Sequence, residues 1–369
     1  MMEKKRILVC IGTRPEAIKM CPLVLELKKR SALEVSVCST GQHREMLRDA
    51  MSAFGVRADI DMDIMREGQT PEQVICAILE RAGEIFERTR PDTVAVHGDT
   101  CSALAVSLSS FLHGIPVAHV EAGLRSGDMR APFPEEFNRR AITLAATYHF
   151  APTQSAASNL FEEGVKPRSV FVTGNTVIDA LTYTLRDGFS HPLLDECGDK
   201  KIIFLTAHRR ESCGQTLVGM LCAVRRICEQ NADVRVIFPV HPNPAVRRVA
   251  EDVLGDCKSV HLCEPLSVVD CHNIMANSYL ALTDSGGIQE EAAALGLPVL
   301  VMRGVTERPE GIMAGVARLA GTDSEQIYVT VSELLRDRAL HKKMSVSKNP
   351  YGDGNACRRI ADVLLSDTK

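Results

Sequence analysis

A serine and two glycines at residues 285–287 separate an apolar run, residues 279–282, from a helical pattern with Glu290 and Glu291 near its start. Glycine lets a backbone approach a ligand closely, and a helix N-terminus offers unpaired N–H groups at the positive end of its dipole. This chemistry suits a phosphate, while a nearby glutamate could accept from ribose hydroxyls. The pattern favours a nucleotide that carries a sugar, although the glycines could also serve only to make a tight turn.

A second candidate for anion binding follows the first apolar run of the chain, residues 6–11. Gly12 permits a tight turn there, and Pro15 suits the first position of a helix, where its missing N–H costs nothing. Arg14 and Lys19 bring positive charge to the start of this helix. We predict binding of a diphosphate or nucleotide, with two solvated surface charges as the alternative.

Three carboxylates lie where a parallel sheet would present them to a ligand. Asp99 follows the apolar run at residues 93–97, Glu121 follows residues 116–120, and Glu135 opens a helix behind a proline-rich loop. Burial beside a strand could raise the pKa of Glu121 into a range useful for proton transfer. These residues are therefore candidates for acid–base catalysis.

Each of these carboxylates also has a structural alternative. Asp99 could simply be the N-cap of the next helix. Glu121 could be an ion-pair partner of Arg125 or Arg130, and Glu135 could complement the dipole of its own helix.

The second half of the chain adds histidines at the ends of predicted strands. His208 follows residues 202–206 and is next to Arg209, so it could serve an anionic leaving group, or be a structural histidine. His241 follows residues 234–240 and begins a rigid His-Pro turn.

The elements that must position these residues alternate between apolar strands and helices. Strands are expected at residues 6–11, 34–39, 93–97, 116–120, 148–151 and 170–173, and again at 201–206, 234–240, 260–262, 279–282 and 298–302. Helices are expected at residues 15–30, 43–54, 71–89, 102–112, 138–145 and 155–163, and at 216–230, 245–254 and 267–277. Uniformly apolar strands alternating with helices indicate parallel sheets covered on both faces. The periodicity breaks near residues 175–199, which predicts two doubly wound α/β domains, with ligands beyond the carboxyl ends of the strands.

Composition narrows the class of protein. The 369 residues are 45% hydrophobic and 24% charged, with a net charge of −4, which gives no support for a nucleic-acid partner. No apolar stretch approaches the length of a membrane span, and the run behind the basic residues 4–6 is too short for a signal peptide. We therefore predict a cytoplasmic protein whose thirteen cysteines, none spaced C-x-x-C, are mostly small core residues.

Taken together, these motifs resemble those of the non-hydrolysing UDP-N-acetylglucosamine 2-epimerases. The matching runs cover nearly the whole chain, at residues 12–20, 42–47, 96–100, 119–125, 132–136, 173–180, 208–211, 283–291, 306–310 and 349–354. The resemblance implies a GT-B fold, in which two Rossmann-like domains flank an active-site cleft. The expected domains are residues 1–176 and a UDP-binding domain at 177–354, with a C-terminal helix, about residues 355–369, packed back onto the first.

The resemblance also implies a reaction. The family interconverts UDP-GlcNAc and UDP-ManNAc, which supplies ManNAc-type sugars for cell-surface polysaccharide. UDP is eliminated in the anti sense with loss of the C2 proton, which gives 2-acetamidoglucal, and UDP re-adds after protonation from the other face. No metal and no nicotinamide cofactor is expected.

Site residues are carried over position by position. The resemblance assigns catalytic roles to Asp99, Glu121, Glu135 and His208, and leaves open which carboxylate removes the proton and which returns it. It assigns UDP binding to Arg14, Lys19, Leu266, Cys271, Ser285, Gly286, Gly287, Glu291 and Arg308, with Glu291 on the ribose hydroxyls. Cys271 stands where many relatives have a phenylalanine near uracil, so that ring packing is lost here.

The resemblance further implies a second, activating UDP-GlcNAc beside the catalytic one, and a homodimer. Gln42, Gln69, Glu135, Arg209 and His241 match the residues of the activating site. The arginine expected just before Gln69 is replaced by Gly68.

Other functions remain open at this stage. On the same fold the chain could be a hydrolysing epimerase that releases ManNAc and UDP, a glycosyltransferase, or an epimerase for a related UDP-diacetamido sugar. A non-catalytic UDP-sugar sensor is a further alternative, against which the intact set of carboxylates argues.

Overall fold

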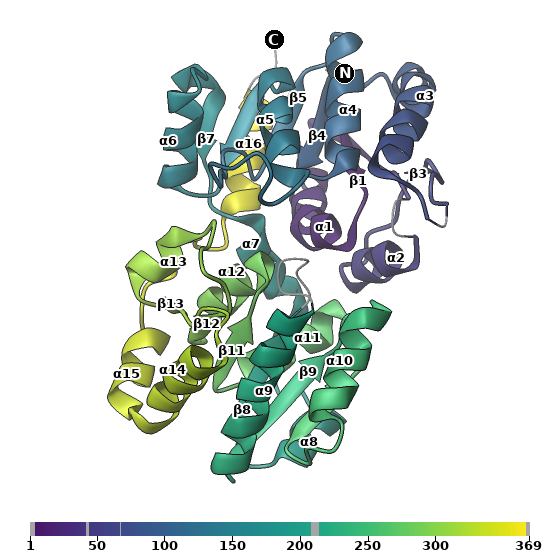
Figure 1. Ribbon diagram of the computed structural model, residues 1–369. Coiled ribbons are helices and arrows are strands. Elements are labelled where there is room, and N and C mark those ends of the chain that lie inside the picture. The colour runs from purple at the N-terminus through teal and green to yellow at the C-terminus, as the bar shows by residue number, and fades with distance from the viewer. Residues whose placement is uncertain (1–3, 42–43, 67, 208–213, 367–369) are drawn as a thin grey trace. The chain divides into compact units, whose positions relative to one another are not determined.

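The computed structural model describes residues 4–41, 44–66, 68–207 and 214–366, in which the chain forms two compact units (Figure 1). The first unit comprises Met1–Tyr183 together with Gly352–Lys369, and the second comprises Thr184–Tyr351. The sequence placed the first division at 176/177. Instead, nearly all of helix α7 (Thr176–Thr184) belongs to the first unit.

The first unit is built on a seven-stranded sheet in the order β3-β2-β1-β4-β5-β6-β7. Neighbouring strands pair in parallel, as in the register Leu8↔Val94 between β1 and β4. Every residue of β4 and β5 is buried, so both faces of the sheet are covered and the strands are apolar throughout. The strands are β1 (Lys5–Ile11), β2 (Leu33–Ser39), β3 (Ile60–Asp61), β4 (Thr93–His97), β5 (Val117–Val120), β6 (Tyr148–Ala151) and β7 (Val170–Val172).

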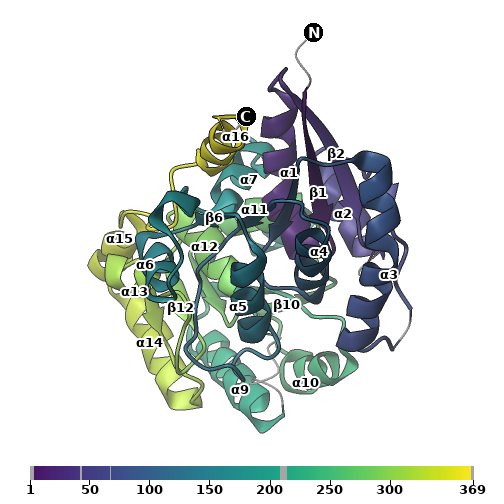
Figure 2. The same ribbon diagram turned by 90° about the horizontal axis from the view of Figure 1, so that it is seen from above.

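Two groups of helices cover this sheet (Figure 2). Helix α1 packs against α2 and α16, whereas α4 packs against α3 and α5. The helices are α1 (Arg14–Lys28), α2 (Arg44–Ala53), α3 (Pro71–Thr89), α4 (Cys101–Leu112), α5 (Glu135–Ala145), α6 (Gln154–Glu162), α7 and α16 (Ala356–Ser366), with a short 3₁₀ helix at Pro167–Ser169.

The second unit has a six-stranded parallel sheet in the order β10-β9-β8-β11-β12-β13. Side chains of β8 alternate between two cores: Ile203 and Leu205 face the cluster with α9 and α14, whereas Ile202 and Phe204 face the cluster with α11 and α12. The strands are β8 (Lys201–Thr206), β9 (Val234–Pro239), β10 (Val260–Cys263), β11 (Leu280–Thr283), β12 (Val299–Val301) and β13 (Ala317–Leu319).

The helices of the second unit complete the alternation predicted from the sequence. They are α8 (Pro192–Cys197), α9 (Gln215–Gln230), α10 (Pro244–Leu254), α11 (Val268–Ala276), α12 (Gly286–Ala294), α13 (Pro309–Ala314), α14 (Ser324–Arg336) and α15 (Arg338–Ser345). The sequence analysis did not resolve α7, α8, α13, α14, α15, β3 or β13. Among the described helices, none combines the length and the apolar character that a membrane crossing requires.

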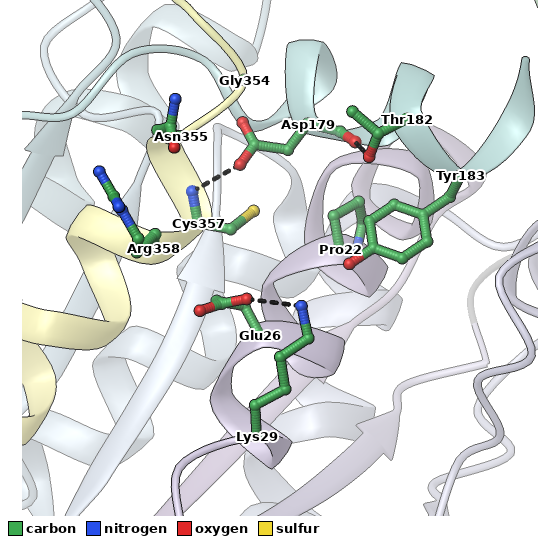
Figure 3. Close-up of a pocket in the computed structure, with 10 residues that line it drawn as sticks. All are labelled: Pro22, Glu26, Lys29, Asp179, Thr182, Tyr183, Gly354, Asn355, Cys357 and Arg358. Atoms are coloured by element: carbon green, nitrogen blue, oxygen red, sulfur yellow. Dashed lines mark hydrogen bonds and ion pairs between the residues drawn. The ribbon is translucent and has the colours of Figure 1, made fainter.

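The C-terminal helix α16 is anchored to the first unit by a buried carboxylate. Asp179 of α7 accepts hydrogen bonds from the backbone N–H groups of Ala356 (3.2 Å) and Cys357 (2.9 Å), the first residues of α16. Figure 3 shows the bond to Cys357. These N–H groups have no partner within the helix, and the carboxylate also complements the helix dipole. A pocket of about 210 Å³ lies beside this contact and is lined by residues of α1, α7 and the start of α16. None of the predicted site residues lines it.

Candidate functional site

Glu121 lies directly after β5 and is surrounded by polar groups from other elements. Its Oε2 forms an ion pair with Lys19 of α1 and accepts a hydrogen bond from Asn175 Nδ2 at 2.8 Å. His97 Nε2, at the end of β4, lies 3.7 Å from the same oxygen. The side chains of Glu121 and Lys19 are only 10% and 7% exposed, so this charged pair is shielded from water. The resemblance assigned UDP binding to Lys19. In this structure the ammonium group of Lys19 forms an ion pair with Glu121.

Arg125, one of the alternative partners considered for Glu121, is paired with another carboxylate. Arg125 forms an ion pair with Glu163 at 2.5 Å, which lowers the pKa of the Glu163 carboxyl. Glu121 also has a left-handed backbone, with φ of 63°, which is costly for a residue with a Cβ. The fold therefore holds this carboxylate in a special conformation as well as in a special electrostatic environment.

A buried histidine supports the turn after β4, where Gly98 and Asp99 lie. His119 is inaccessible to solvent, and its Nε2 lies 2.7 Å from the carbonyl oxygen of Gly98. Because a carbonyl only accepts, Nε2 must carry the hydrogen. Burial lowers the pKa of His119 to about 3, so this histidine is neutral and structural.

Asp99 is tied to helix α5. Arg139 donates to Asp99 Oδ2 through Nε at 3.1 Å and also through Nη2, and Asn138 Nδ2 donates to the Asp99 carbonyl oxygen at 2.8 Å. The Asp99 side chain is still 29% exposed, whereas that of Arg139 is 7% exposed. Asp99 is thus paired with Arg139 and remains accessible. The side-chain N-cap of α4 is the next residue, Thr100.

The two glutamates that open α5 have different environments. Glu136 is fully buried; it forms ion pairs with Arg139 (3.2 Å) and Arg140 (3.1 Å), and it accepts from the Ser126 N–H at 3.0 Å. It therefore has the structural role that helix-dipole and i,i+4 pairing predict. Glu135 Oε2 is also buried, but no described residue forms a hydrogen bond with it. The pairing that the structural alternative predicted for Glu135 is thus made by Glu136, whereas Glu135 Oε2 has no hydrogen-bond partner among the described residues.

Glu16, in the first turn of α1, is a buried carboxylate that the sequence analysis did not single out. It is 2% exposed and accepts from the Gly12 N–H at 3.0 Å and from Thr100 Oγ1 at 2.9 Å. Burial raises the pKa of this carboxyl, and interaction with His97 together with the hydrogen bonds opposes that effect. An acidic residue in a first helical turn is so common that only its burial distinguishes it.

In the second unit, the turn after β11 begins helix α12 as the sequence predicted. The Ser285 N–H donates to Thr283 Oγ1 at 2.9 Å, and Thr283 Oγ1 lies 2.5 Å from Thr206 Oγ1 at the end of β8. Ser285 occupies the N-cap position, but its side chain does not cap the helix. The turn is therefore held by hydroxyl groups at the ends of strands β11 and β8.

Arg308 lies directly over this turn. A Cβ added at Gly286 would be 2.4 Å from Arg308 Nη1, so the guanidinium group could not stay where it is with a larger residue at this position. Arg308 Nε donates to Glu290 at 2.7 Å and Nη1 donates to Glu307 at 2.8 Å, and the Arg308 side chain is 9% exposed. The structure thus brings a fixed cation to the N-terminus of α12, an arrangement suited to a diphosphate.

Glu291, one residue further along α12, is 7% exposed. Its Oε2 lies 3.5 Å from His272 Nε2 on α11, and His272 Nδ1 lies 2.7 Å from Thr184 Oγ1. Cys271, which precedes His272, is partly buried with its neighbour Leu266 in the core cluster of α11 and α12. The structure places these predicted UDP residues on adjoining elements of one unit.

Several predicted positions are not tested by this geometry. His208, Arg209 and Gln42 lie outside the described residues. Gln69 lies in the loop before α3 in the first unit, where its Oε1 accepts from the Arg66 N–H at 3.3 Å. His241 follows β9 in the second unit, where its Nδ1 accepts from the Asn243 N–H at 3.2 Å. Arg14 lies at the start of α1.

Comparison with known proteins points to one family with this two-unit fold. Residues 25–365 match the family model described as UDP-N-acetylglucosamine 2-epimerase. The UDP-N-acetylglucosamine 2-epimerase of Bacillus subtilis is 53% identical, over 99% of this chain and 96% of that protein.

Solved structures give the same result. The crystal structure of a putative UDP-N-acetylglucosamine 2-epimerase from Listeria monocytogenes matches 99% of this chain and 97% of its own chain, with a TM-score of 0.96. The two sequences are 46% identical. The crystal structure of the UDP-GlcNAc 2-epimerase from Neisseria meningitidis, bound to UDP-GlcNAc, matches 98% of this chain and 100% of its own chain, with a TM-score of 0.93. The two sequences are 39% identical.

The fold and these likenesses define the class: an epimerase built from two Rossmann-like α/β units of the GT-B type, which confirms the predicted fold class. The chain belongs to the UDP-N-acetylglucosamine 2-epimerase family.

Proposed function

We propose that this chain reversibly interconverts UDP-GlcNAc and UDP-ManNAc without releasing a free sugar, and so supplies ManNAc-type sugars for cell-surface polysaccharide. In the forward direction the C2–H bond and the C1–O bond to the diphosphate break, which gives 2-acetamidoglucal, UDP and a proton on an enzyme carboxylate. In the return, a proton reaches C2 on the opposite face as a diphosphate oxygen re-forms its bond to C1.

The observation that carries this proposal is the set of carboxylates at one edge of the first sheet. Inversion at C2 needs a group that takes a proton on one face and a group that returns one on the other. Asp99 is paired with Arg139, Glu121 is paired with Lys19, and Glu135 Oε2 is buried with no described hydrogen-bond partner. Different environments are what separate acid from base among chemically similar groups.

The second unit supports the other half of the reaction. Departure of UDP develops negative charge on the diphosphate, and fixed donors stabilise that charge without reorganising. We assign this role to the Ser285-Gly286-Gly287 turn with Arg308, and assign ribose binding to Glu291. The relatives' names support UDP-GlcNAc as the substrate. His208 is proposed, from the family resemblance alone, to act near the leaving group.

Proton NMR of the purified chain with UDP-GlcNAc in D2O tests the proposal. We expect UDP-ManNAc to appear, with deuterium at C2 of both sugars and little free ManNAc. Asp99→Asn and Glu121→Gln should each lower turnover by about 10²–10⁴-fold, because proton transfer is lost. In Asp99→Asn, UDP affinity measured by calorimetry should change less than about threefold, because the assigned UDP turn lies in the other unit.

The matched control is Glu333→Gln, an exposed carboxylate of α14 that pairs with Arg318; it should keep full turnover. Free ManNAc and UDP as the main products would show the hydrolysing reaction instead. Turnover without deuterium at C2 would contradict removal and return of the C2 proton by two different carboxylates, because the returned proton would then come from solvent. Full activity in both carboxylate variants would show that the catalytic residues are wrongly assigned.

A further inference from the structure

Glu16 is held at both carboxylate oxygens between two turns of the first unit. Oε2 accepts from the backbone N–H of Gly12, in the turn after β1, and Oε1 accepts from the hydroxyl of Thr100, in the turn after β4. Strands β1 and β4 are neighbours in the sheet, so Glu16 bridges two adjacent strand-to-helix turns. Only 2% of the Glu16 surface is exposed, and burial of a carboxylate is costly unless hydrogen bonds of this kind compensate for the lost water.

The place that the Glu16 carboxylate occupies is one where doubly wound folds bind phosphate. The first strand-to-helix turn presents a backbone N–H and the positive end of a helix dipole to an anion. Here the Gly12 N–H already has an anion from its own chain. The turn predicted from the sequence as a phosphate site is therefore filled internally in this structure.

Glu16 contacts or adjoins residues that hold two of the proposed catalytic carboxylates, Asp99 and Glu121. Thr100 donates to Glu16 while its Oγ1 accepts from the Ala103 N–H at 2.9 Å, and it directly follows Asp99. Lys19, one turn after Glu16 on α1, forms the ion pair with Glu121. A shift of Glu16 would thus move the Asp99 turn and the cation on Glu121 together.

We propose that Glu16 is a positioning residue whose carboxylate acts as a built-in anion in the first turn and holds Asp99 and Lys19 in register. The positioning role rests on the proposed epimerisation. The anion role does not, because it follows from the two hydrogen bonds alone.

Two variants separate charge from hydrogen bonding. In Glu16→Gln the amide oxygen can accept from Gly12 and the amide nitrogen can donate to Thr100 Oγ1, so both links persist without the charge. In Glu16→Ala both links are lost and the position is vacated. Glu26→Ala is the matched control, because Glu26 lies on the same helix and its described ion pairs are with Lys29 and Arg30, not with the turns after β1 and β4.

Three measurements on the full chain test the two roles of Glu16: steady-state turnover, UDP calorimetry and thermal melting. We expect Glu16→Ala to lower kcat about 100-fold, as small misplacements of catalytic groups do, with KM and the Kd for UDP changed less than about threefold. Glu16→Gln should fall between Glu16→Ala and wild type. Sodium formate, a carboxylate small enough for the vacated place, should restore kcat of Glu16→Ala at least about tenfold, saturably, and raise its Tm. Sodium chloride at equal ionic strength should do neither.

Turnover of Glu16→Ala within twofold of wild type would overturn the positioning role. Equal losses of kcat, UDP affinity and Tm that formate does not reverse would show that Glu16 serves folding alone. A wild-type chain without epimerisation would overturn the proposed function, and the positioning role with it. The formate shift in Tm, present in Glu16→Ala and absent in wild type and Glu26→Ala, would still decide whether the carboxylate fills an anion position.

Discussion

The partner of each carboxylate decides what that carboxylate can do. Glu136 and Glu135 are adjacent in the chain, yet Glu136 is surrounded by two arginines and a backbone N–H, whereas Glu135 Oε2 has no described hydrogen-bond partner. A buried carboxylate whose hydrogen bonds are all made is fixed in place, whereas one with an unmade hydrogen bond can still accept one from a ligand. Two adjacent glutamates can therefore have different roles, because each has its own set of partners.

The fit between Gly286 and Arg308 gives a prediction for nucleotide binding. In Gly286→Ala the added methyl group would lie 2.4 Å from Arg308 Nη1, so the guanidinium group must move away from the turn. We expect the Kd for UDP, measured by calorimetry, to rise about tenfold, which corresponds to about 1.4 kcal/mol.

The control for this change is Gly219→Ala on helix α9, where an added Cβ meets no atom within 4 Å. That substitution should leave UDP affinity unchanged and raise the free energy of unfolding by about 0.5–1 kcal/mol, since alanine favours a helix interior. Unchanged UDP affinity in Gly286→Ala would remove Arg308 from the proposed diphosphate site.

The buried, neutral state of His119 gives a prediction for stability against pH. Its folded pKa of about 3 is below the usual value of about 6.5, so the unfolded chain binds the proton more readily. The stabilisation is fully present above pH 6.5 and is lost as the pH falls toward 3. Relative to His119→Gln, the wild-type free energy of unfolding should fall by about 2 kcal/mol more between pH 7 and pH 5.

Urea denaturation at a series of pH values measures this difference for the two chains. Glutamine can still donate to the Gly98 carbonyl, so an overall difference in stability between the chains is not the test; the slope against pH is. Parallel curves would contradict a neutral, buried His119. His149, whose pKa is also lowered by burial, contributes equally to both chains.

At the scale of elements, the strands were predictable because they are buried on both faces and therefore apolar throughout. Elements whose stability comes from tertiary contact were not. Helix α7 lies in a stretch that its glycines and proline marked as a break, yet Val177, Ala180 and Leu181 are buried and Asp179 caps α16. Strand β3 is two residues long and offers no periodicity at all.

The contact between α7 and α16 gives a prediction at this scale. Asp179→Ala leaves the first N–H groups of α16 without an acceptor in a buried place, and loss of an N-terminal cap costs about 1–2 kcal/mol. We expect that decrease in the free energy of unfolding by urea denaturation, and faster proteolysis at α16.

Asp362→Ala provides the comparison, because Asp362 lies on α16 and forms an exposed ion pair with Arg30 at 2.8 Å. Surface pairs of this kind contribute less than about 1 kcal/mol. Equal effects of the two substitutions would show that the cap adds nothing beyond an ordinary surface pair.

At the scale of the whole molecule, the two-unit fold was predictable from the sequence, and so were candidate positions for a site, but not the pairings among those positions. The candidates follow strands, and the carboxyl ends of parallel strands meet at one edge of a sheet, which is why Asp99 and Glu121 could be singled out. That Lys19 pairs with Glu121, across about a hundred residues of chain, depends on how α1 packs and has no local signature. The same is true of Glu16 with Thr100, and of Gly286 with Arg308.

The return of the chain to its first unit has a consequence for synthesis. Helix α16 packs against α1, but the ribosome makes it after the whole of the second unit. At about 5–20 residues per second, roughly ten to forty seconds separate the release of α7 from that of α16. During this interval the apolar face of α1 that α16 will cover stays open, and Asp179 has no helix to cap. The nascent first unit thus exposes an apolar helix face until α16 is made, even though its sheet is already complete.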